Sequence, residues 1–211
     1  MIRYRFIEQN VLKIYKQLPE IQFPVRLMEI ISLIPNCRFM SYQELADLTK
    51  YSLSDIISIC NSESGCTFYD SAQDRYLILC NQSKEYNSVR RQRWTCCHEI
   101  GHVICNHNPA TIFSPIPENG SQLSQNEQFE READFFTASL LAPLPFFKPL
   151  GVRSPADIMR IFGLSSESAK YRFAEFQEWD RSHRKTAWEN DMLRQLKLKY
   201  DIRNDILLSI R

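Results

Sequence analysis

Apolar residues recur every three or four positions along much of this chain, which is the spacing that places side chains on one face of an α-helix. Residues 1–35 show this pattern between Val11 and Leu18, and Pro19 and Pro24 interrupt it. Because proline ends or kinks a helix, this stretch predicts a helical lead-in made of short segments.

The clearest helical pattern lies in residues 127–143, where Pro143 is expected to end the helix. The preceding residues 111–126 are rich in Pro, Ser, Asn and Gln and predict a loop. The apolar face of the expected helix consists of Phe129, Ala133, Phe136 and Leu140.

The first half of the chain carries signals of short helices and of a β-hairpin. Ser41 and Glu44 form a capping box that predicts the start of a helix, and a second short helix is expected over residues 54–60. Residues 65–70 and 75–81 contain aromatic and aliphatic residues on either side of a polar turn, which predicts a β-hairpin. Many helices with one small antiparallel sheet indicate an α+β fold.

The C-terminal part of the chain predicts a pair of helices within residues 155–176. The first should end at Gly163 and the second should begin after Ser165, which is the outline of a helix-turn-helix. A charged tail follows from Arg181. These patterns divide the chain into a helical lead-in, a core and a C-terminal helical region, at residues 1–35, 36–150 and 151–211.

The composition narrows the classes of protein that this chain can belong to. Of 211 residues, 44% are hydrophobic and 24% are charged, as in globular domains, and a net charge of +1 gives no overall attraction to nucleic acid or anionic membranes. No run approaches the ~20 apolar residues of a membrane span, and the first residues lack the apolar core of a signal peptide. Seven cysteines, an odd number, favour a reduced, cytoplasmic location.

A His-Glu-x-x-His motif at residues 98–102 predicts a metal site. Residues four apart on a helix project from the same face, so His98 and His102 can bind one ion with Glu99 beside them. Two histidines and one carboxylate suit a single zinc ion, and a neighbouring carboxylate can take a proton from water bound to it. The motif predicts a zinc hydrolase with Glu99 as general base. Gly101 lies between the two histidines, and because glycine destabilises a helix, its presence indicates close packing or a role in the site.

The third protein ligand must come from another segment, and two glutamates compete for this role. Glu132 falls on the apolar face of the helix at 127–143, where a carboxylate is costly to bury unless it is paired or metal-bound. Glu130 lies about 200° around the helix, on the side of Asp134 and Arg131. We expect Glu132 to be the third ligand, with Glu130 as the alternative and a solvated boundary position as the alternative role for Glu132.

The sequence gives weaker support for other metal ligands and for a residue that stabilises an oxyanion. A metzincin would need glycine and histidine seven and ten residues after His98, where the chain has Cys105 and Asn108. His107 is one residue too early and is interpreted as an ordinary histidine near a helix end. For a donor that stabilises an oxyanion, the candidates by residue type are Tyr69, Tyr76 and Tyr86.

Two blocks of sequence together resemble the ImmA/IrrE metallopeptidases. Residues 91–102 read Arg-Gln-Arg-Trp-Thr-Cys-Cys-His-Glu-Ile-Gly-His, and residues 132–143 read Glu-Ala-Asp-Phe-Phe-Thr-Ala-Ser-Leu-Leu-Ala-Pro. The resemblance covers roughly residues 40–175. It implies a zincin-like domain in which His98, His102 and Glu132 bind the metal and Glu99 acts as general base. The departures from the family pattern are Trp94, Thr137 and Ala142.

The resemblance also implies a substrate, namely a helix-turn-helix repressor whose cleavage relieves repression. Such a protein would be bound as an added strand on the edge of the sheet. Two alternatives are a non-catalytic binder and a DNA-binding regulator that uses residues 155–176. We expect no direct binding to DNA or membranes, because Lys148, Lys170 and Arg172 are few cations for phosphate contacts.

Overall fold

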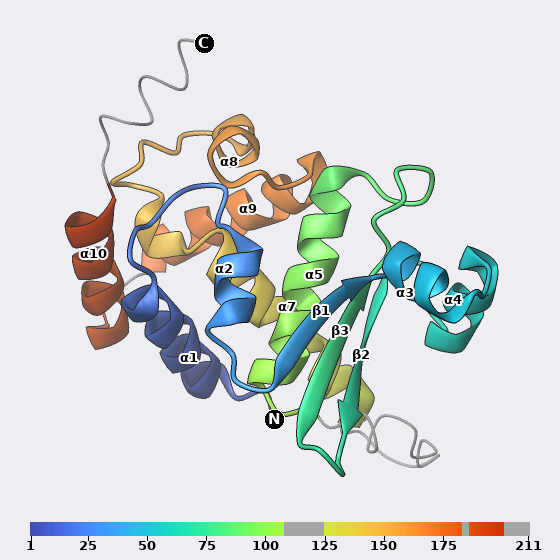
Figure 1. Ribbon diagram of the computed structural model, residues 1–211. Helices are drawn as coiled ribbons and strands as arrows, with labels where there is room; N and C mark the ends of the chain where they lie inside the picture. The colour runs from blue at the N-terminus through green and yellow to red at the C-terminus, as the bar shows by residue number, and fades with distance from the viewer. Residues whose placement is uncertain (108–124, 183–185, 201–211) are drawn as a thin grey trace, which may run out of the picture. The chain divides into compact units, whose positions relative to one another are not determined.

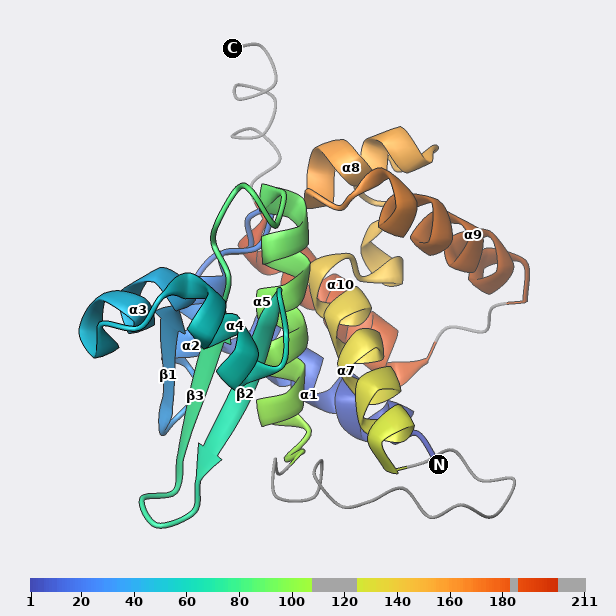
Figure 2. The ribbon, with the colours of Figure 1, turned by 90° about the vertical axis from the view of Figure 1, so that its right-hand side faces the viewer.

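The computed structural model describes residues 1–107, 125–182 and 186–200, and Figures 1 and 2 give two views of it. Most of the predicted loop (residues 111–124), His183 and the end of the charged tail lie outside the described residues. The elements in order are α1 (Tyr4–Gln17), α2 (Leu27–Ser32), β1 (Cys37–Ser41), α3 (Tyr42–Thr49), α4 (Leu53–Cys60), β2 (Gly65–Asp70), β3 (Arg75–Cys80), α5 (Val89–Ile104), α7 (Gln125–Leu141), the 3₁₀ turn η1 (Leu144–Phe146), α8 (Pro155–Phe162), α9 (Ser166–Ser182) and α10 (Ala187–Lys199).

The chain forms two compact units. The first contains Met1–Ile7 and Leu27–Ala138, and the second contains Glu8–Arg26 and Ser139–Arg211. The predicted division into residues 1–35, 36–150 and 151–211 stays a prediction. Among the described residues, no helix is both long and apolar enough to cross a membrane.

The first unit contains a three-stranded sheet in the order β1-β3-β2. The predicted hairpin is confirmed, because β2 and β3 pair antiparallel from Gly65 opposite Cys80 to Asp70 opposite Arg75. The sequence pattern does not predict β1, which pairs parallel with β3 and makes the sheet mixed. This order leaves β2 as an edge strand, and it lies beside α5 (Val89–Ile104), the predicted motif helix (Figure 2).

The two faces of the sheet pack against different helices. Alternate residues of a strand point to opposite faces, so Leu79 and its neighbours on one face pack with Tyr42 and Ile56 of α3 and α4. Thr67, on the other face, contacts α5. The capping boxes at Ser41 and Ser52 satisfy the first N–H groups of α3 and α4, as the sequence predicts for the first of them.

Gly101 allows α5 and α7 to approach each other closely (Figure 2). A β-carbon at this position would lie 3.1 Å from the Cα atom of Ala133 and 3.2 Å from its carbonyl oxygen. The packing explanation that the sequence suggests for this glycine is therefore confirmed. The helix α7 ends at Leu141, two residues before Pro143, and Ala133, Phe136 and Leu140 are fully buried, as expected.

The second unit contains the predicted helix pair. The helix α8 ends at Gly163, whose φ of 70° is in the left-handed region, and α9 begins three residues later. Phe147 stacks on Phe162 of α8 and contacts Phe176 of α9, which holds the pair together through a buried aromatic core. Together the two units give the expected α+β fold of a zincin-like domain with additional helices.

Candidate metal centre

The motif residues lie on the helix α5, as predicted. The side chain of Ser88 caps this helix by accepting a hydrogen bond from the N–H of Arg91, and no proline interrupts the helix before His98. The Nε2 atoms of His98 and His102 lie 3.0 Å apart, as expected for residues one turn apart on the same face. His102 and Glu99 are buried, whereas His98 is partly exposed.

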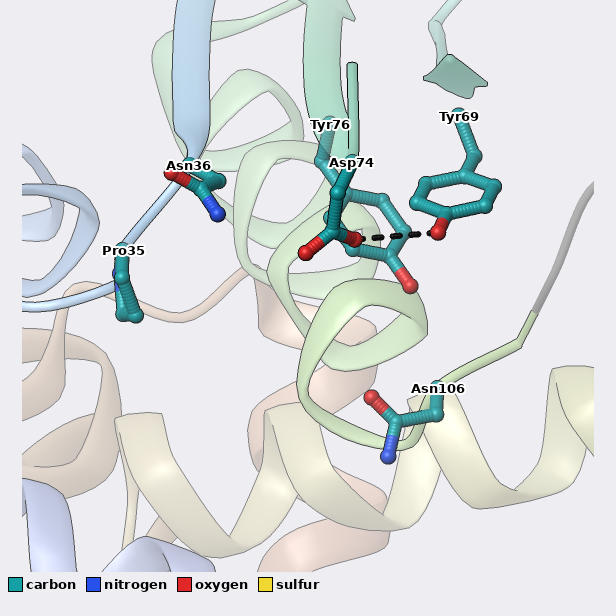
Figure 3. A pocket seen from close by; sticks show the side chains of 6 residues that line it. All are labelled: Pro35, Asn36, Tyr69, Asp74, Tyr76 and Asn106. Atoms are coloured by element: carbon teal, nitrogen blue, oxygen red, sulfur yellow. Dashed lines mark hydrogen bonds between the residues drawn. The ribbon is translucent and has the colours of Figure 1, made fainter. Parts of the chain in front are cut away.

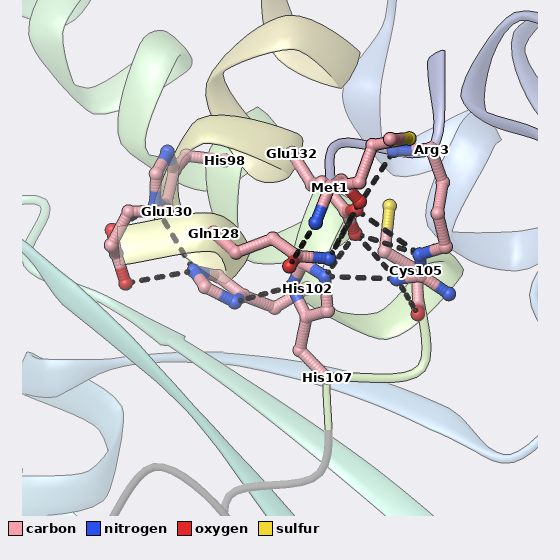
Figure 4. A network of polar contacts seen from close by, with 9 residues as sticks. All are labelled: Met1, Arg3, His98, His102, Cys105, His107, Gln128, Glu130 and Glu132. Carbon is pink, nitrogen blue, oxygen red and sulfur yellow. Dashed lines mark hydrogen bonds and ion pairs between the residues drawn. The ribbon is translucent and has the colours of Figure 1, made fainter. Parts of the chain in front are cut away.

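A carboxylate of α7 completes this cluster, and it belongs to Glu130. One oxygen of Glu130 lies 3.0 Å from Nε2 of His98, and the other lies 3.5 Å from Nε2 of His102 (Figure 4). The side chain of Glu130 is 57% exposed, so the cluster is open to solvent. One turn further along α7, Asp134 lies 3.0 Å from Nδ1 of His98.

The donor atoms of this cluster fit a tetrahedral zinc ion. Bonds of about 2.0–2.2 Å place neighbouring ligand atoms of a tetrahedral site roughly 3.2–3.6 Å apart. The Nε2 atoms of His98 and His102 are 3.0 Å apart, and they lie 3.0 Å from Oε2 and 3.5 Å from Oε1 of Glu130, respectively, which is close to this spacing, with two of the contacts slightly shorter. Both histidines direct Nε2 into the cluster and Nδ1 outward to another residue, which is the usual arrangement of metal-binding histidines.

Glu132, the expected third ligand, does not lie with the two motif histidines. It is fully buried, as its position on the apolar face implies, but its oxygens accept hydrogen bonds from Arg3 at 3.0–3.1 Å, and His107 Nε2 lies 3.0 Å away. Burial opposes ionisation of Glu132, but the bonds from Arg3 and His107 prevail and lower its pKa to about 2. Arg3 therefore helps to offset the cost of burying this carboxylate.

Glu99 faces the edge strand of the sheet. Oγ1 of Thr67 donates a hydrogen bond of 2.6 Å to its carboxylate. Burial raises the pKa of Glu99, while the positive charge of His98 and the bond from Thr67 act in the opposite direction. The carboxylate is therefore held in one orientation and has an increased proton affinity, as a general base needs.

The two motif histidines differ in their affinity for protons. Burial opposes protonation of His98, but its contacts with Asp134 and Glu130 prevail and raise its pKa to about 10. Burial and the nearby charge of His98 lower the pKa of His102 to about 3. The carboxylates around His98 therefore favour a positive charge at this position, whereas His102 stays neutral.

A hollow of about 440 Å³ lies at the free end of the hairpin (Figure 3). Tyr69, two residues after Thr67 on β2, donates its hydroxyl to Asp74 at 3.0 Å, and its ring lies 4.6 Å from that of Tyr76. Two of the three candidate oxyanion donors therefore line this hollow, and the third, Tyr86, is exposed. The remaining lining residues are Pro35, Asn36 and Asn106.

Thr67 and Asp134 belong to the site although the sequence motifs do not identify them. Thr67 carries no signal in the sequence, because only the folded sheet brings it to Glu99. Asp134 does carry one, since Glu130 and Asp134 are four residues apart and can face the equally spaced His98 and His102. The side of α7 that carries Glu130 and Asp134 is therefore the side that meets the histidines.

Comparison with protein families matches residues 63–174 to the model described as Peptidase_M78, the IrrE N-terminal-like domain. The matched segment includes the hairpin, α5, α7, α8 and the first half of α9. Comparison with curated proteins gives no match.

Proposed function

Because this chain belongs to the IrrE N-terminal-like domain family of peptidases, we propose that it is a zinc-dependent endopeptidase. One observation carries the proposal: beside Glu99, the Nε2 atoms of His98 and His102 lie 3.0 Å apart, and one carboxylate, that of Glu130, reaches both of them at 3.0 and 3.5 Å through its two oxygens. We propose these three residues as the zinc ligands, with Glu130 in place of Glu132, and one ion per chain.

The catalytic groups follow from this arrangement. Zinc bound there would polarise the scissile carbonyl and lower the pKa of a bound water. Glu99 takes a proton from the attacking water and then delivers it to the leaving amine. Thr67 holds the Glu99 carboxylate during both transfers, and Asp134 keeps Nδ1 of His98 protonated so that Nε2 stays available as a ligand.

We further propose that the substrate binds along the edge of β2. This strand pairs with β3 on one side, and Thr67 contacts the general base from the same strand. Main-chain hydrogen bonds to a strand edge hold an extended peptide with little dependence on its sequence. A peptide substrate with single N-methylated amides tests this, because methylation should block cleavage at alternate positions only. Equal cleavage of all the methylated peptides would contradict this mode of binding.

For the substrate, we propose a cytoplasmic helix-turn-helix repressor, on the basis of the resemblance to ImmA/IrrE peptidases. The seven cysteines, five of them buried and all free, support a reducing compartment. Cleavage of such a repressor would affect transcription without contact between the peptidase and DNA.

The experiment combines metal analysis with a cleavage assay. The purified protein is assayed for bound zinc and incubated with a repressor encoded beside its gene, with and without a chelator. We expect fragments from the metal-loaded protein, no fragments after chelation, and recovery when zinc is added back. Glu99→Gln should keep its zinc and lose about 10²–10⁴-fold in cleavage rate, the usual contribution of a general base.

Glu85→Gln serves as the matched control, because Glu85 is an exposed glutamate on the loop before α5 and should behave like the wild type. Cleavage that persists in Glu99→Gln would refute the mechanism. Cleavage that persists after complete removal of metal would refute the class of enzyme. A metal-dependent protein that leaves the repressor intact but cuts another protein would refute only the substrate.

The cations of the second unit give little support to the alternative function as a DNA-binding regulator. Arg172, one of the three cations considered for DNA, is buried, and it donates to the carbonyl of Ala142 and to Glu175. Lys148 forms an ion pair with Asp180. A helix that reads DNA needs outward-facing cations, and here two of the three are already used within the protein.

A further inference from the structure

A second polar cluster lies beside the proposed metal ligands (Figure 4). It is built around Glu132 and His107, whose side chains are fully buried. Arg3 donates to Glu132 from its backbone N–H and from its guanidinium, and Gln128 donates to the same carboxylate at 3.1 Å. Every one of these residues belongs to the first compact unit.

His107 joins this cluster to the metal ligand His102. The Nδ1 atoms of the two rings lie 3.0 Å apart, and Nε2 of His107 lies 3.0 Å from an oxygen of Glu132. The chain of contacts therefore runs from His102 through His107 to Glu132 and ends at Arg3, which is 40% exposed.

One arrangement of protons satisfies all of these contacts. For Nε2 of His102 to bind a metal, its proton must be on Nδ1, so Nδ1 donates to Nδ1 of His107. Nδ1 of His107 then accepts, its proton is on Nε2, and Nε2 donates to Glu132. The Nη2 atom of Arg3 is 3.3 Å from Nε2 of His107 and instead donates to Glu132 and to the carbonyl of Cys105 at 2.8 Å.

We propose that His107 and Glu132 are positioning residues for His102. Glu132 selects the tautomer of His107, His107 fixes the tautomer and orientation of His102, and Arg3 balances the charge of Glu132. This proposal rests on the zinc site proposed above. It gives Glu132, the carboxylate on the apolar face of α7, a role in positioning His102. Outer residues of this kind typically contribute about 10–100-fold to metal affinity.

The same cluster could be mistaken for a second metal site. Cys105, His107 and Glu132 have ligand atoms within 4.8 Å of one another. However, the guanidinium of Arg3 already contacts both oxygens of Glu132, so the cation that this carboxylate needs is part of the protein. The proposal therefore requires one metal ion per chain, not two.

The test measures zinc affinity by competition with a chromogenic chelator, together with the visible absorption spectrum of the cobalt-substituted protein. In His107→Ala and Glu132→Gln we expect zinc affinity to fall about 10–100-fold and the cobalt bands to shift. His107→Asn should recover most of the affinity, because its side-chain oxygen can accept the proton of His102 near the position of Nδ1. Glu132→Gln keeps the shape of the side chain, so the test does not depend on the alanine variant folding.

Thr137→Ala is the matched control. Thr137 is a fully buried polar residue on the same helix, and its hydroxyl donates to the carbonyl of Ala133. This variant should lose stability while keeping wild-type zinc affinity and cobalt bands. If the His107 and Glu132 variants behaved in the same way, the cluster would be merely structural and the proposal would be overturned.

Two further outcomes separate this inference from the proposed function. Two zinc ions per wild-type chain, falling to one in Glu132→Gln, would overturn the positioning role in favour of a second site. A wild-type protein that binds no zinc would refute the metal centre itself and the positioning role with it. Normal zinc binding and cleavage in the wild type, with unchanged affinity in the variants, would refute only the positioning role.

Discussion

Thr67 on the edge strand β2 donates a 2.6 Å hydrogen bond to Glu99 on α5. This bond connects the strand along which we propose that substrate binds with the residue that we propose as general base. The close approach of α5 to the sheet depends on Gly65, where a β-carbon would lie 2.6 Å from Cγ2 of Thr95.

Replacing Thr67 should therefore change the pH dependence of cleavage. The bond from Thr67 lowers the pKa of Glu99, which burial raises, so Thr67→Val should raise this pKa further. Because Glu99 must be ionised to accept a proton, the acidic limb of kcat/KM against pH should move to higher pH. Thr67→Ser, which keeps a hydroxyl, should retain the wild-type profile, and an unshifted limb in Thr67→Val would contradict the role of this bond.

Glu130 and Glu132 should differ in their effect on bound metal. We expect Glu130→Ala to remove a ligand and to weaken zinc binding by more than the ~10–100-fold typical of an outer residue. Glu132→Gln should stay within that range. Isothermal titration of the metal-free proteins with zinc measures both affinities. The reverse order would restore Glu132 as the ligand that the sequence favours.

The spacing between α5 and α7 should affect both the zinc affinity and the free energy of unfolding. A methyl group at Gly101 would meet backbone atoms of Ala133 at 3.1–3.2 Å, and α7 also carries Glu130. We expect Gly101→Ala to lower the free energy of unfolding by about 1–3 kcal/mol, despite the better helix propensity of alanine. It should also weaken zinc binding, because α7 must move away from the histidines. Urea unfolding and zinc titration measure the two effects, and a stabilised variant with normal affinity would show that α7 can shift without cost.

Asp157 should make the second unit more stable at neutral pH than in acid. The N–H of Arg153 contributes most to lowering its pKa, and Ser154 and Arg160 contribute further. A carboxyl group whose pKa is lower in the folded state stabilises the protein above its unfolded pKa of about 3.9, and this contribution is lost as the pH falls. Asp157→Asn should reduce stability at pH 7 by about 0.3–1 kcal/mol, as for a charge at a helix N-terminus. Urea unfolding at pH 7 and pH 3 should give a difference at neutral pH only, and equal differences at both pH values would contradict this origin.

Features determined within a few residues could be predicted from the sequence. The capping box at Ser41, the hairpin and the end of α8 at Gly163 depend on local hydrogen bonds and on the conformational freedom of single residues. The repeat of the helix places the two motif histidines on one face, so this pairing could be predicted, whereas the 3.0 Å between their Nε2 atoms also depends on the contacts of the rings with Asp134 and His107. The strand β1 could not be predicted, because its partner β3 is 34 residues or more away and supplies the pairing that its own sequence does not indicate.

The sequence alone placed Glu132 on an apolar helix face, where burial would require a partner, and it placed His98, Glu99 and His102 together on one short stretch of helix. Only the tertiary structure decided which partner Glu132 has and which carboxylate reaches the histidines. Burial makes a positive partner necessary, but an arginine 129 residues earlier satisfies this need as well as a metal does. The face of α7 that meets α5 depends on the packing at Gly101, and this packing turns Glu130 toward the proposed site.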